Sequence, residues 1–202
     1  MNKKNKKNKK NKINYHGYLK LPFEKMLRLT KHKSTQVERP PDTENKNYHL
    51  NRSKKEMAYS KKITKLYSMS KNTALSFRYT NPKITNMIPD SFWKKFKMDK
   101  NRARVQIMHH LPGTVSIPHI DRFHRMMQDL KLDNDPNKRK QVRRIWVSLT
   151  EPKLGHALFV GNEVAYNLKR GTILTWNANE IHSACNVGDE DRFVLTVTGF
   201  CG

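Results

Sequence analysis

From Arg102 onward, apolar and polar residues alternate in short runs that turn-forming residues separate. Between Arg104 and His110, for example, Val105 and Ile107 alternate with Gln106 and Met108. A two-residue period places successive side chains on opposite faces of a β-strand. We therefore predict that this half of the chain is built mainly from strands.

Further runs of this kind follow along the chain, and glycine or proline stands between several of them. The predicted strands span residues 104–110, 114–119, 144–149, 157–160, 164–168, 172–176 and 193–198. Seven or eight short strands with intervening turns are typical of a double-sheet jelly roll, also called a double-stranded β-helix. We predict such a core over residues 102–202, with helices of the N-terminal half packed outside it.

The N-terminal half has a different composition. Residues 1–12 repeat an Asn-Lys-Lys unit and contain seven lysines, so we expect a disordered tail that buries nothing. Residues 13–101 form a basic segment that we expect to be helical or irregular. Helices are predicted over residues 24–29, 53–69 and 90–96, and the last carries an apolar stripe of Phe92, Trp93 and Phe96.

Charge is distributed unevenly along the chain. Residues 1–100 hold 27 basic and 7 acidic residues, a net charge of +20, whereas residues 101–202 hold 14 and 10, a net charge of +4. Such a cationic half favours polyanionic partners such as nucleic acid or a ribonucleoprotein. The alternative is that AT-rich codons enrich lysine and asparagine without any function, and composition leaves both explanations open.

The chain has two cysteines, Cys185 and Cys201, so no disulfide framework or cysteine-based zinc site is indicated. No apolar run approaches the length that spans a membrane, and no signal-peptide core follows the basic N-terminus. We expect a cytoplasmic protein in a reducing compartment, without a membrane partner.

The strongest chemical motif is His119-Ile-Asp121, which places an imidazole and a carboxylate on one face of a strand. His182, from a later strand, would complete a face of two histidines and one carboxylate. This ligand set leaves three positions of an octahedral metal open, as non-heme Fe(II) oxygenases require. The same three side chains could instead hold zinc and a water molecule, which would indicate a hydrolase.

Arg192 is the only charged residue in the apolar run Arg192–Gly199. A lone arginine that enters a buried strand needs an anion, and a cosubstrate carboxylate would serve. The alternative partners are the acidic residues that precede it directly, Asp189, Glu190 and Asp191.

Five other polar residues are weaker candidates. Thr196 and Thr198 share the strand face of Arg192, and Asn186 could bond a cosubstrate or orient the turn after His182. The adjacent His109 and His110 must point to opposite faces of their strand, so at most one of them faces the site.

His119-Ile-Asp121, followed by His182 and then Arg192, resembles the Fe(II)/2-oxoglutarate-dependent oxygenase superfamily over roughly residues 102–200. The short motifs around these residues also resemble those of the superfamily: Leu111-Pro-Gly-Thr, Gly155-His, Lys169-Arg-Gly171-Thr-Ile-Leu and His182-Ser-Ala-Cys-Asn-Val-Gly188. The resemblance implies Fe(II) on His119, Asp121 and His182, and 2-oxoglutarate that chelates the metal and reaches Arg192. It also implies O2 as oxidant, succinate and CO2 as products, and ascorbate as an optional reductant.

Within the superfamily, the His-to-Arg spacing resembles that of aspartyl/asparaginyl hydroxylases, although that branch usually lacks the acid present here at Asp121. A protein or amino-acid side chain, as in those and the prolyl hydroxylases, is therefore the expected substrate, with residues 122–142 placed to act as a lid. Nucleic acid is an alternative substrate, but demethylases of this superfamily usually carry a second arginine where this chain has Thr198. A non-catalytic, basic β-sandwich binding module is the third hypothesis.

Overall fold

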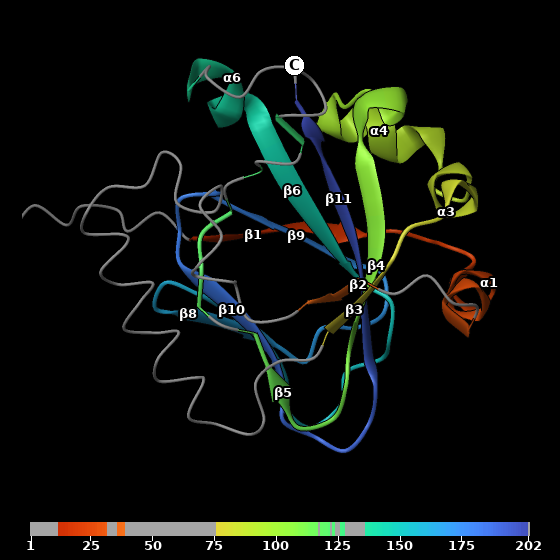
Figure 1. Ribbon diagram of the computed structural model, residues 1–202, viewed down its shortest axis with the longest axis vertical. Helices are drawn as coiled ribbons and strands as arrows, with labels where there is room; N and C mark the ends of the chain where they lie inside the picture. The colour runs from red at the N-terminus through yellow and green to blue at the C-terminus, as the bar shows by residue number, and fades with distance from the viewer. Residues whose placement is uncertain are drawn as a thin grey trace, which may run out of the picture.

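The computed structural model describes residues 12–31, 36–38, 76–116, 118–121, 123, 126–127 and 136–201. Two antiparallel sheets face each other (Figure 1), one of seven strands in the order β1-β9-β6-β11-β4-β3-β2 and one of four in the order β5-β10-β7-β8. The strands of the large sheet are β1 Ile13–Tyr18, β2 Gln36–Glu38, β3 Ser76–Tyr79, β4 Arg104–His110, β6 Val142–Ser148, β9 Thr172–Trp176 and β11 Arg192–Phe200. Those of the small sheet are β5 Thr114–Val115, β7 His156–Val160, β8 Glu163–Tyr166 and β10 His182–Asn186.

The two faces of the large sheet bury different sets of side chains. Along β11, Val194 points between the sheets and packs with Trp146 and Leu158, whereas Leu195 and Val197 point to the opposite face. This alternation is the two-residue period of the sequence made visible in space. The predicted mainly β double-stranded β-helix is therefore confirmed.

The outer face of the large sheet is covered by short helices, which Figure 1 shows beside β4. They are α1 Phe23–Arg28, α3 Pro82–Asn86 and α4 Asp90–Phe96, while α6 Pro136–Gln141 precedes β6. Phe92 and Trp93 of α4 and Met26 of α1 are buried in the same cluster as Leu195. The predicted helices at residues 24–29 and 90–96 are confirmed, and they pack outside the sheet as expected.

The N-terminal half also contributes strands, which the sequence did not indicate. β1 pairs with β9, and β3 pairs with β4 and β2, so these segments extend the large sheet on both sides. In β1, Ile13 is buried, but Tyr15 and Tyr18 are more than half exposed. A peripheral strand that buries so few side chains lacks the clear alternation that would reveal it.

β1 is fastened at its start by acidic side chains. The backbone N–H groups of Lys12 and Ile13 both donate to the Glu163 carboxylate at 3.0 Å. The Lys12 ammonium contacts Glu180 Oε2 at 2.9 Å. The end of the lysine-rich tail is thereby held beside the loop that leads to His182.

Two parts of the chain differ in detail from the predicted strands. The predicted strand 114–119 is short: β5 covers Thr114–Val115, and a single bridge pairs His119 with His182. His182 begins β10, a strand outside the predicted ranges, which backbone pairing with β7 and β5 extends to Asn186. The predicted helix at 53–69 and most of the predicted lid at 122–142 lie outside the described residues. In the part of the chain that the structure describes, no helix is long and apolar enough to span a membrane.

Candidate metal centre

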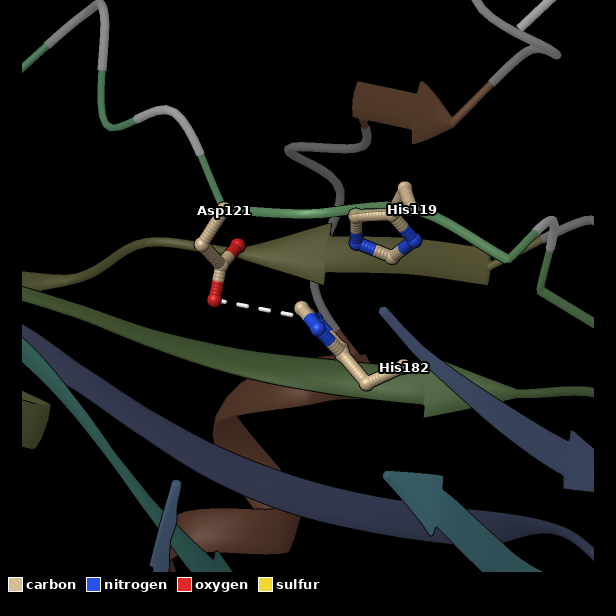
Figure 2. A group of neighbouring side chains, drawn as sticks. All are labelled: His119, Asp121 and His182. Atoms are coloured by element: carbon tan, nitrogen blue, oxygen red, sulfur yellow. Dashed lines mark ion pairs between the residues drawn. The ribbon is translucent and has the colours of Figure 1, made fainter. Parts of the chain in front are cut away.

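His119 and His182 are brought together by a reciprocal pair of backbone hydrogen bonds. The His119 N–H donates to the His182 carbonyl at 3.0 Å, and the His182 N–H donates to the His119 carbonyl at 2.8 Å. The two imidazole centroids are 4.4 Å apart. Asp121 lies two residues beyond His119 on the same segment, and Figure 2 shows its carboxylate directed toward His182.

One potential ligand atom from each of His119, Asp121 and His182 lies within 4.8 Å of the other two. Asp121 Oδ2 is 3.6 Å from His182 Nε2 (dashed line in Figure 2). Ligands on adjacent octahedral positions, with bonds near 2.1 Å, are about 3 Å apart. A small closure of this cluster would therefore bring the three atoms onto one ion.

The hydrogen bonds of His182 favour its Nε2 atom as a ligand. Its Nδ1 atom is 3.0 Å from the Glu180 carbonyl, which can only accept, so Nδ1 carries the proton and Nε2 keeps its lone pair. Burial, together with nearby His119, lowers the pKa of His182 to about 4, although Asp121 opposes this. A neutral imidazole at pH 7 binds metal, and its approach to Asp121 is then not a salt bridge.

Asp121 is ionised, and only one of its two carboxylate oxygens has a hydrogen-bond partner. Burial raises the pKa of Asp121, but the guanidinium of Arg144, followed by His182 and His119, outweighs burial and holds the pKa below its ordinary value. Arg144 Nη1 donates to Asp121 Oδ1 at 2.5 Å. Asp121 Oδ2 is buried and has no hydrogen-bond partner. A carboxylate oxygen in this state is costly unless a cation coordinates it, so the three side chains fit a metal ion.

Arg192 is almost completely buried, with 2% of its surface exposed. Its Nη1 atom donates to the carbonyls of Ala157 and Cys185, at 2.7 and 2.6 Å, and the guanidinium lies 4.8 Å from the centroid of the Trp146 ring. Burial lowers the pKa of Arg192 only to about 10, so the group stays charged at neutral pH.

The acidic residues before Arg192 do not neutralise it. Asp191 contacts His109 at 3.1 Å and Glu190 contacts Lys153 at 2.7 Å. Among the residues that the structure describes, no ion pair joins a carboxylate to Arg192. Because Cys185 lies three residues along β10 from His182, the guanidinium is roughly 10 Å along the strand from the metal cluster.

The remaining predicted residues are engaged within the protein. Thr196 Oγ1 donates to the Gln106 carbonyl at 3.4 Å, and Thr198 Oγ1 accepts from Arg144 Nε at 3.3 Å. The Asn186 amide donates to the carbonyls of His110 and Glu190, at 2.9 and 2.8 Å, so it ties the turn to β4. Their roles toward a cosubstrate stay predictions.

Sequence reasoning missed Arg144, which holds one oxygen of Asp121. It lies on β6 opposite Thr198 of β11, a register that brings it to the metal side of the large sheet. The charged residue within an apolar strand was a visible signal. The direction of the Arg144 side chain could not be predicted, because alternation along one strand does not tell which of its two faces meets the neighbouring sheet.

No family model matches the sequence, and no curated protein matches it. Among solved structures, a viral collagen prolyl hydroxylase from Paramecium bursaria Chlorella virus-1, in its 2OG complex, has 13% identity and a TM-score of 0.43, covering 62% of this chain and 78% of the other. A predicted oxalate decarboxylase from Thermotoga maritima has 14% identity and a TM-score of 0.37, covering 62% and 80%. An uncharacterised double-stranded β-helix protein from Klebsiella pneumoniae has 20% identity and a TM-score of 0.34, covering 50% and 69%.

Proposed function

We propose that the chain is an Fe(II)- and 2-oxoglutarate-dependent dioxygenase that hydroxylates a protein or amino-acid side chain. The observation that carries the proposal is the combination of a His-Asp-His cluster, in which Asp121 and His182 are buried, with a buried arginine that has no carboxylate partner among the described residues. A zinc hydrolase would need the cluster alone. The charged Arg192 at the far end of the same barrel calls for an anion, and a 2-oxo diacid supplies one.

Each side chain has a separate task in this proposal. His119, Asp121 and His182 would hold iron, which supplies oxygen activation coupled to decarboxylation of the 2-oxo acid. Arg144 orients Asp121 so that Oδ2 stays available. Arg192 would bind the distal carboxylate, and Trp146, whose ring centroid lies 4.8 Å from the guanidinium, would exclude water from that pairing.

The test measures metal and cosubstrate turnover together. The protein, loaded anaerobically with Fe(II) and then given 2-oxoglutarate, ascorbate and O2, is expected to release succinate slowly without a substrate. His182→Ala and Asp121→Ala are expected to lower iron affinity about 100-fold or more, since each removes a ligand. His16→Gln, a histidine bonded to Thr175 on the other side of the sheet, is the matched control and keeps wild-type affinity.

Two results would overturn the proposal. If both ligand variants bind iron as tightly as the wild type does, these residues do not form a metal centre. Iron bound by the cluster without any 2-oxoglutarate-dependent succinate would keep the metal centre and exclude the dioxygenase; zinc-dependent hydrolysis of a model ester would then support the hydrolase.

The same chemistry on a nucleic acid is the second candidate. The net charge of +20 over residues 1–100 favours it, because neutralised phosphates release counterions. A salt titration with single-stranded DNA or RNA separates the two substrates. Tight binding that weakens steeply with rising salt would support nucleic acid, whereas weak binding even at low salt would leave protein side chains as the substrate class.

A further inference from the structure

His110 faces the interior of the barrel, beside Arg192. The two residues are direct partners in the register of β4 with β11, and neighbouring side chains in such a pair stand on the same face of the sheet. His109 therefore points the other way, where its ring stacks on Phe193 with centroids 4.2 Å apart and lies 3.1 Å from Asp191.

His110 is buried, and its Nε2 atom has no hydrogen-bond partner. Only 2% of its surface is exposed, and Nε2 has no hydrogen-bond partner in the structure. Leaving a buried nitrogen of this kind unpaired is costly, so the polar atoms of buried histidines are normally hydrogen-bonded. Asn186 donates to the His110 carbonyl at 2.9 Å and thereby holds the end of β4 in place.

The surroundings of His110 are cationic. Burial lowers the pKa of His110 to about 3, with further lowering by Arg192, His109, His156 and Arg78. The imidazole is consequently neutral at pH 7, and it carries one N–H that can donate. A buried guanidinium thus lies next to an unsatisfied imidazole nitrogen, and no acidic side chain of the described residues is paired with the guanidinium.

We infer that His110 is a specificity-determining residue that donates from Nε2 to the same carboxylate that Arg192 binds, and so selects a 2-oxo acid with a second carboxylate. The inference rests on the proposed function, since the ligand is its cosubstrate. A water molecule would satisfy His110 but would leave the charge of Arg192 without a counterion, whereas a carboxylate satisfies both.

The experiment compares two ligands that differ only at the distal end. Titration calorimetry on the anaerobic Fe(II) protein gives Kd for 2-oxoglutarate and for 2-oxopentanoate, which has a methyl group in place of the distal carboxylate. His110→Leu is expected to raise Kd for 2-oxoglutarate about tenfold or more, because a hydrogen bond to a charged group is lost. Kd for 2-oxopentanoate is expected to stay unchanged.

Two further variants separate recognition from folding. His110→Gln keeps an N–H donor in a similar place and is expected to recover part of the affinity for 2-oxoglutarate. His109→Leu removes a histidine from the opposite face of the same strand and is expected to bind both acids as the wild type does. Thermal melting of each variant shows that the protein is folded under the conditions of the titration.

The outcomes distinguish this inference from the proposed function. If the wild type binds iron but no 2-oxoglutarate, the proposed function fails and the role of His110 fails with it. If the wild type binds 2-oxoglutarate and His110→Leu binds it equally well, only the role of His110 is overturned. Equal weakening of both acids in His110→Leu would assign the residue to packing of the barrel and would also overturn the inference.

Discussion

Arg144 determines which oxygen of Asp121 remains for a metal. It occupies Oδ1 and leaves Oδ2 directed toward His182. Groups that orient a ligand in this way change metal affinity between about 10- and 100-fold when they are removed. We expect Arg144→Met to weaken iron binding within that range, measured by competition with a chelator of known affinity.

Arg143 provides the control for this prediction. It precedes Arg144, points to the other side of β6, and donates to the Lys140 carbonyl at 2.5 Å. Arg143→Met removes the same charge and is expected to leave iron affinity unchanged. If both variants weaken binding equally, net charge rather than orientation of Asp121 is responsible.

Burial of His110 predicts acid sensitivity of the metal-free protein. The pKa of His110 is about 3 when folded, against an ordinary value near 6.5, so below pH 6.5 the unfolded chain binds a proton that the folded chain does not. The stability contribution is fully present above about pH 6.5 and falls by about 1.4 kcal/mol per pH unit on acidification toward pH 3.

Denaturant unfolding between pH 7 and pH 5 measures this effect. The free energy of unfolding is expected to fall with pH, and His110→Gln is expected to fall less steeply, because glutamine does not titrate. A parallel slope for the two proteins would mean that other groups account for the acid sensitivity.

At the scale of elements, β1 depends on one carboxylate. Glu163 of β8 accepts hydrogen bonds from the backbone of Lys12 and of Ile13, and so links the two sheets at one edge. We expect Glu163→Gln to lower the free energy of unfolding by about 1–2 kcal/mol, because two bonds to a charged acceptor become bonds to a neutral one. Chemical denaturation measures the change.

Glu151→Gln is the comparison for Glu163→Gln. Glu151 is exposed and contacts Arg170 at 3.7 Å, an arrangement that contributes little in water. A loss of stability as large in Glu151→Gln would show that the effect comes from general charge balance and not from anchoring β1.

How far the elements could be predicted depends on what each buries. The strands of the second half bury side chains on both faces or on alternate positions, so β4, β6, β9 and β11 were visible in the sequence. β1 was not, because its pairing partner β9 lies far away in the chain and its exposed tyrosines obscure the pattern. His119, Asp121 and His182 were predicted as a group, whereas the inward direction of His110 required the β4–β11 register.

At the scale of the whole molecule, charge separates the two halves of the chain. Six lysines of the N-terminal half lie in residues 1–11, ahead of the first residue that the structure describes. If the tail contributes to binding of a polyanion, its removal is expected to reduce the slope of log affinity against log salt by up to about five. Fluorescence anisotropy with a labelled duplex measures both slopes, and equal slopes would show that the tail takes no part.

The fastening of Lys12 has a geometric consequence for any such partner. Lys12 contacts Glu180, whose carbonyl accepts from the imidazole of His182, a candidate metal ligand. The tail therefore joins the described chain at a residue that is one side-chain contact away from Glu180. If residues 1–11 capture a polymer, it would be tethered close to the His119-Asp121-His182 cluster, and the reach of eleven residues would set its local concentration there. If a polyanion binds the tail, weak capture there is then sufficient to keep it near this cluster through repeated encounters.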